Sequence, residues 1–175
     1  SSQLISLILF GIAASFSPGP NNIVTSYSAY NFGFKKTIPT ILGVVSGWTL
    51  LSILLLFGST IIFTKFENLQ IIIKILGSAY LLFLAYKISF NKIKSEKRVL
   101  KPVTFLNTFF FQFVNPKSII CGSTAVSLFV DIQSNYIKDS IIFVFVMFLV
   151  AVGSQTSWCL MGSYLRKFAT SEKFM

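Results

Sequence analysis

The chain has 175 residues, of which 54% are hydrophobic and only 11% are charged, and its formal net charge is +10. Soluble domains carry about 25% charged residues, so this composition excludes a soluble globular domain. The basic residues stand mostly between apolar runs, as in cytoplasmic loops of membrane proteins, which argues against nucleic acid as a partner. The sequence contains no histidine, and its two cysteines, Cys121 and Cys159, form no CxxC motif. We therefore expect no metal and no cofactor, and an enzyme is disfavoured.

Five apolar stretches are long enough to cross a lipid bilayer, which takes about 20 predominantly apolar residues. We expect Gly33 to cap the end of the first stretch, and Pro39 to stand near the start of the second. The sequence thus predicts an all-α polytopic membrane protein. The five predicted spans are residues 4–32, 38–63, 69–90, 105–130 and 141–165.

The charges between the spans predict how the chain is oriented. Basic residues follow the first, third and fifth spans, whereas the other side carries few of them, balanced by acidic residues. Because basic loops favour the cytoplasm, we expect the N-terminus to lie outside an inner-membrane protein. The basic set is Lys35, Lys36, Lys87, Lys92, Lys94, Lys97, Arg98, Lys101, Arg166, Lys167 and Lys173.

Two of the spans contain a polar interruption with proline. The first interruption runs from Ser17 to Asn22, and the second is Asn115-Pro116-Lys117. Proline removes a backbone donor and clashes with the preceding turn, so each interruption should break or kink its helix. Lipid tolerates such a break only where protein or a water-filled cavity covers the freed backbone groups. We expect the breaks to be shaped by Pro18, Gly19, Pro20 and Pro116.

The interruptions stand about half a chain apart and point to two related halves. Residues 1–90 would form a first three-helix repeat, 91–103 a basic cytoplasmic linker, and 104–175 a second repeat. Residues 43–48 and 153–158 share the pattern Gly-x-x-Ser/Thr-small-Trp. A three-span unit ends on the side opposite its start, so the second copy would be inverted. The second repeat would lack its last helix, which leaves five spans of an expected six.

The broken helices predict a binding site for a zwitterion. A break exposes N–H groups at one new helix end and carbonyls at the other. The N–H end attracts carboxylates, and the carbonyl end can hold an ammonium group. Gln155 suits a hydrogen bond between helices at least as well as a substrate contact. The candidate substrate-binding residues are Asn21, Asn22, Asn115, Lys117 and Gln155.

These motifs resemble the lysine/threonine exporter family, LysE/RhtB. The likeness covers nearly the whole chain and rests on residues 17–22 (SPGPNN), 31–33 (NFG) and 113–117 (FVNPK). The resemblance implies an inner-membrane exporter of amino acids and their derivatives, with six helices in two inverted halves. It also implies export driven by the proton motive force and a substrate path lined by the two proline segments. The chain looks closest to members that export cysteine-type or neutral amino acids.

Other interpretations stay open at this point. A non-transporting or truncated membrane protein of the same scaffold is the main alternative, and the absent sixth helix supports it. A membrane redox protein is disfavoured because Cys121 and Cys159 lie on different spans. Gly43 and Gly47 would suit a homodimer or packing within one chain. No acidic residue lies well inside a span, so the sequence identifies neither a proton-carrying residue nor the transported amino acid.

Overall fold

The computed structural model describes residues 2–65, 101–131 and 135–169, and every regular element in these ranges is an α-helix. The prediction of an all-helical chain is therefore confirmed for this part. The predicted third span (69–90) and the linker up to residue 100 lie outside the described residues. The helices are α1 (Ser2–Phe16), α2 (Pro20–Phe32), α3 (Phe34–Lys65), α5 (Phe105–Phe111), α6 (Pro116–Phe129) and α7 (Tyr136–Ala169).

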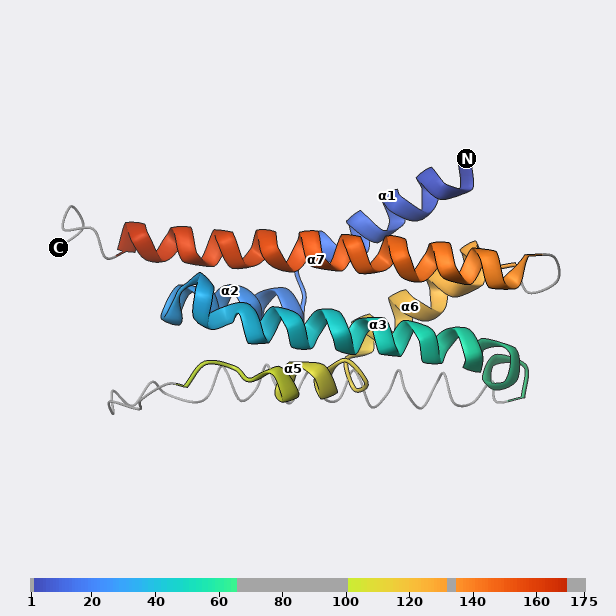
Figure 1. Ribbon diagram of the computed structural model, residues 1–175, viewed down its shortest axis with the longest axis horizontal. Helices are drawn as coiled ribbons and strands as arrows, with labels where there is room; N and C mark the ends of the chain where they lie inside the picture. The colour runs from blue at the N-terminus through green and yellow to red at the C-terminus, as the bar shows by residue number, and fades with distance from the viewer. Residues whose placement is uncertain (1, 66–100, 132–134, 170–175) are drawn as a thin grey trace.

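Two long helices form the frame of the molecule. Helices α3 and α7 have 32 and 34 residues, and both contain a window apolar enough to cross a membrane. They run along the long axis of the molecule in opposite directions (Figure 1). Helix α3 starts at Phe34, before the predicted start at residue 38, and Pro39 lies inside it. Because Pro39 has no N–H, the carbonyl of Lys35 loses its helical partner there.

The first broken segment consists of α1 and α2, and it matches the predicted interruption. Residues 17–19 separate the two helices, which meet at an angle of 56° and together qualify as one membrane span. Pro20 occupies the first turn of α2, where the absence of an N–H costs nothing. Gly33 ends α2 as predicted, with φ 83° and its N–H bound to the carbonyl of Ala29 at 2.8 Å.

The second broken segment consists of α5 and α6. Helix α5 ends at Phe111, four residues before the predicted break at 115. The next three residues form a turn in which each N–H binds the carbonyl three positions back, at 3.2 to 3.3 Å. Asn115 is extended, with φ −77° and ψ 109°, as expected of a residue before proline. Its side chain caps α6 by accepting the N–H of Lys117 at 3.1 Å.

Small residues let the broken segments pack closely against the long helices. A Cβ at Gly47 would lie 2.8 Å from Cγ of Gln112, and one at Gly43 would overlap the carbonyl of Phe105. A Cβ at Gly162 of α7 would overlap the backbone of Ser26 in α2. Gly43 and Gly47 of α3 therefore serve helix packing within one chain. The segments α1–α2 and α5–α6 run in opposite directions, and their breaks meet near the middle of the molecule (Figure 1).

Candidate functional site

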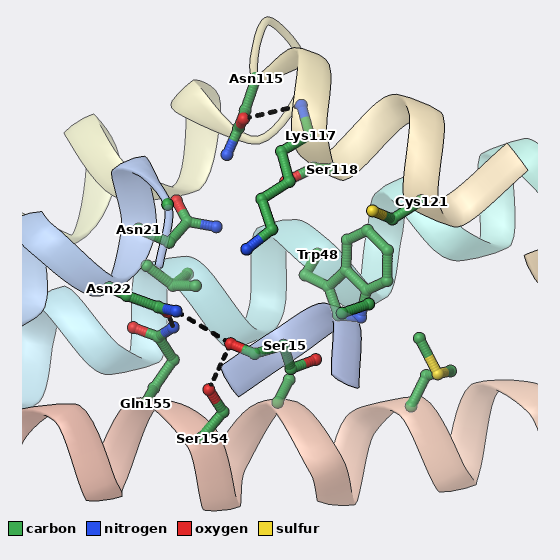
Figure 2. Close-up of a pocket in the computed structure, with 15 residues that line it drawn as sticks. Ser15, Asn21, Asn22, Trp48, Asn115, Lys117, Ser118, Cys121, Ser154 and Gln155 are labelled. Carbon is green, nitrogen blue, oxygen red and sulfur yellow. Dashed lines mark hydrogen bonds between the residues drawn. The ribbon is translucent and has the colours of Figure 1, made fainter. Parts of the chain in front are cut away.

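A pocket lies where the two breaks meet, between α3 and α7. Its volume is about 60 Å³, which is room for one or two water molecules, so a larger ligand has to widen it. Its lining includes all five candidate binding residues (Figure 2). Sequence reasoning did not single out several of the others, which are small or apolar and carry no motif. The further lining residues are Ala14, Ser15, Gly19, Val44, Trp48, Ser118, Cys121, Met147, Ala151 and Ser154.

The start of α2 contributes a helix N-terminus to this pocket. Gly19 is the N-cap and offers no side chain to the backbone N–H groups, and Pro20 has no N–H of its own. The N–H groups of Asn21 and Asn22 precede the first intrahelical bond, which Ile23 donates to the carbonyl of Gly19 at 3.0 Å. The partial positive charge of such a helix end favours an anion, and a carboxylate is the simplest one.

Asn22 and Gln155 connect the first break to α7. Gln155 Nε2 donates to Asn22 Oδ1 at 2.8 Å, and Thr25 donates to Gln155 Oε1 at 2.6 Å. Asn22 Nδ2 donates in turn to the carbonyls of Ser15 and Ser17, at 2.9 and 2.8 Å. Gln155 therefore makes the interhelical hydrogen bond that the sequence allowed, and it also lines the pocket (Figure 2).

Gln112 joins the two broken segments, and sequence reasoning missed it. Asn21 Nδ2 donates to Gln112 Oε1 at 2.8 Å, while Gln112 Nε2 donates back to Asn21 Oδ1 at 2.9 Å. Ser118 Oγ donates to the same Oε1 at 3.0 Å. The side chain of Gln112 is fully buried. The available signal was a single amide in the otherwise apolar run 109–114, because a buried amide needs partners.

Lys117 reaches across the pocket from α6 to the end of α1. Its Nζ donates to the carbonyl of Ser17 at 2.6 Å, to the hydroxyl of Ser17 at 2.8 Å and to the carbonyl of Pro18 at 3.5 Å. These acceptors follow the C-terminus of α1, where the helix dipole favours a cation. A Cβ at Gly19 would lie 2.8 Å from Cδ and 2.9 Å from Nζ of Lys117. Glycine at this position therefore makes room for the lysine.

The opposite side of the pocket is apolar and contains sulfur. Trp48 of α3, Cys121 of α6 and Met147 of α7 form this wall. Trp48 is buried and lines the pocket. Trp158, its counterpart in the sequence pattern, is not among the lining residues. The pocket thus has a polar half built on the breaks and a neutral half that suits an uncharged side chain.

Comparison with known proteins gives the family. The pattern of the LysE-type translocators matches residues 12–171. The chain is 30% identical over 161 residues to the cysteine/O-acetylserine efflux protein of Salmonella paratyphi A, covering 90% of this chain and 81% of that protein. It is 28% identical over 159 residues to a protein of the same name from Shigella flexneri serotype 5b, with the same coverage. No solved structure gives a significant match. The chain therefore belongs to the family of LysE-type translocators, and it is an integral membrane transporter rather than an enzyme.

Proposed function

We propose that this translocator exports small neutral amino acids of the cysteine and O-acetylserine type across the cytoplasmic membrane, through the pocket between the two breaks. The names of the two relatives support this substrate class. The observation that carries the proposal is the pairing of opposite helix ends at the first break, beside the pocket, where Lys117 of the pocket lining reaches the carbonyls of Ser17 and Pro18. The N-terminus of α2 and the carbonyls after α1 are three residues apart in the chain. A zwitterionic amino acid offers a carboxylate to the N-terminus of α2 and an ammonium group to the carbonyls.

The proposed binding mode follows from this polarity. The carboxylate binds at the start of α2, beside the side-chain amide of Asn115, and the α-ammonium binds the carbonyls of Ser17 and Pro18. The ammonium of Lys117 already binds these carbonyls, which supports assigning a cation to them. Asn21, Asn22 and Gln155 hold the two breaks in place. The substrate side chain faces Trp48, Cys121 and Met147, a wall without charge that favours a small neutral side chain over that of lysine.

We further infer the transport architecture. The opposite directions of α1–α2 and α5–α6 support two inverted repeats, which rock against each other around the breaks (Figure 1). The positive-inside rule supports an N-terminus outside and a basic linker in the cytoplasm. The proton motive force is the proposed driving force. A homodimer has no specific support, because Gly43 and Gly47 pack on α5 of the same chain.

The test is efflux of preloaded, labelled amino acids from cells that express the chain. The panel contains cysteine, O-acetylserine, serine and lysine, and the variants are Asn115→Ala and Thr104→Ala. Both variants remove a helix N-cap, since Thr104 accepts the N–H of Asn107 at 3.3 Å. Each loss costs about 1 kcal/mol of stability. Only Asn115 lines the pocket, so at equal membrane levels we expect at least tenfold slower efflux from Asn115→Ala and near-normal efflux from Thr104→Ala.

Three results would contradict the proposal in different ways. Equal efflux from both variants would place the substrate site elsewhere. Faster export of lysine than of the neutral amino acids would refute the substrate class. No efflux of any amino acid, from a wild-type chain shown to be inserted, would favour the non-transporting alternative.

A further inference from the structure

We propose that Lys117 carries the proton during export, because its ammonium fills the position that the ammonium of the substrate takes. This proposal rests on the export function proposed above and deepens it by naming the coupling residue. The sequence offered no such residue, since its spans hold no acidic side chain in their interior. The structure supplies a titratable group in direct contact with the first break.

The contacts of Lys117 are those of a bound substrate ammonium. An ammonium group has three N–H donors and no acceptor, and Nζ meets three oxygen atoms. Two of them are backbone carbonyls freed by the end of α1, and the third is the hydroxyl of Ser17. All three acceptors are neutral. Lys117 is thus a tethered ammonium that occupies the carbonyl end of the break.

A substrate and a protonated Lys117 exclude each other from this position. The carbonyls of Ser17 and Pro18 are within 3.5 Å of Nζ, and there is no room for even a Cβ at Gly19 beside the lysine. A second ammonium would compete for the same oxygen atoms and would be repelled by the first. The substrate therefore binds only when Lys117 has left the carbonyls or has lost its proton.

No other charged side chain competes for this role among the described residues that line the pocket. The lining residues from α1, α2, α3 and α7 contain no titratable group. On α6 itself, Cys121 is the second titratable residue of the lining, one helical turn after Lys117. The thiol of Cys121 makes no hydrogen bond to the first break, whereas Nζ of Lys117 donates three hydrogen bonds to Ser17 and Pro18 there. Geometry therefore singles out the lysine.

The resulting cycle balances one proton against one substrate. After the substrate leaves to the outside, the neutral amine of Lys117 takes a proton from water, and its ammonium binds the carbonyls of Ser17 and Pro18. The transporter then returns to the state open to the cytoplasm, with the ammonium of Lys117 on these carbonyls. On the cytoplasmic side, an arriving substrate places its own ammonium on the carbonyls, and Lys117 releases its proton to cytoplasmic water. The substrate keeps all of its protons, and one proton enters for each molecule exported.

The test compares two transport modes of purified protein in liposomes, with labelled cysteine kept reduced. One mode is accumulation driven by an acidic interior, and the other is exchange against unlabelled cysteine without a gradient. Lys117→Gln has no group that takes up the transported proton, and its shorter, neutral side chain places no ammonium on the carbonyls. We expect it to keep exchange within about threefold of wild type and to lose gradient-driven accumulation. Lys117→Arg keeps a permanent cation, so we expect both modes to fall at least tenfold.

Ser127→Ala is the matched control, because Ser127 lies on the exposed face of α6 and binds only its own helix. It should behave as wild type in both modes. A Lys117→Gln protein that still accumulates cysteine with the gradient would overturn the proposal. So would one that is correctly folded and loses exchange as well, because it would make Lys117 a plain substrate ligand.

A second measurement needs no variant. Protonated Lys117 blocks the substrate, and lower pH increases its protonated fraction. The KM of wild-type exchange should therefore rise as the pH falls, with little change in kcat, and a KM that does not depend on pH would overturn the proposal. Wild-type exchange without any response to the proton gradient would refute the coupling role alone. Absence of wild-type transport in both modes would refute the export function itself.

Discussion

At the scale of single residues, Gln112 ties the two breaks together. Its amide exchanges two hydrogen bonds with Asn21 and accepts a third from Ser118. In Gln112→Leu, the buried polar groups of these partners lose their bonds, which costs roughly 1–3 kcal/mol for each unsatisfied group. We expect a lower melting temperature in detergent and slower efflux.

The double variant Asn21→Leu/Gln112→Leu separates stability from transport. Replacing both partners of a buried hydrogen bond by apolar groups is often nearly neutral for stability. The double variant should therefore recover most of the melting temperature and remain inactive in efflux. A double variant as unstable as the sum of its parts would show that the reciprocal amide pair does not couple the breaks.

The sequence pointed to residues whose chemistry is out of place in an apolar span. Asn21, Asn22, Asn115, Lys117 and Gln155 all stood out in this way, and the structure gathers all five around one pocket. The sequence could not reveal their partners. The carbonyls of Ser15, Ser17 and Pro18 act through the backbone, which every residue has. The contact of Lys117 with Ser17 joins positions 100 residues apart, and only the fold creates it.

At the scale of helices, the prolines predicted which spans are broken better than they predicted the residues at which the helices begin and end. The first break follows the proline motif closely, because Pro20 starts α2 directly. The second begins earlier than expected, because the turn after Phe111 already tightens before Asn115. Pro39 was expected near the start of its helix, but α3 begins earlier, at Phe34, and tolerates the proline beyond its first turn. Proline constrains its own N–H and the residue before it, so it fixes a local conformation rather than a helix boundary.

Close packing of α3 on α5 is the feature of the helices most open to test. A methyl group at Gly47 would press on Gln112 and on the backbone of Phe109. Overpacking of this kind costs typically 1–3 kcal/mol, so we expect Gly47→Ala to lower the melting temperature and to slow efflux.

Gly153→Ala is the control for this prediction. Gly153 of α7 corresponds to Gly43 in the sequence pattern, and a Cβ there would meet no atom of the other described segments within 4 Å. Alanine also favours the helix by up to about 1 kcal/mol relative to glycine. Gly153→Ala should therefore be as stable as wild type or more so. Equal losses in the two variants would argue that glycine acts through backbone freedom and not through contact with α5.

At the scale of the whole molecule, composition was the most reliable guide. Runs of apolar residues without charge predicted helices, and long apolar helices are what the described part contains. The angle between α1 and α2 and the meeting of the two breaks lay beyond sequence reasoning, because they depend on packing between distant segments. The similarity of residues 43–48 to 153–158 did not predict similar contacts, since Gly43 is packed and Gly153 is open.

The proposed orientation makes a prediction for the two ends of the molecule. In a Cys121→Ser/Cys159→Ser background, a single cysteine replaces Lys35 or Lys138, which are both exposed. We expect a membrane-impermeant maleimide to label Lys138→Cys in intact cells and Lys35→Cys only after the membrane is opened. The reverse pattern would place the N-terminus inside.

The most direct test of the central claim asks whether substrate occupies the pocket between the breaks. Cys121 lines this pocket, while Cys159 is buried in α7 and does not line it. In a Cys159→Ser protein that still transports, the rate of Cys121 alkylation by N-ethylmaleimide is measured with and without O-acetylserine, which has no thiol. We predict at least fivefold protection, half-maximal at the concentration that half-saturates transport. An unchanged alkylation rate at saturating O-acetylserine would contradict a substrate site at the two breaks.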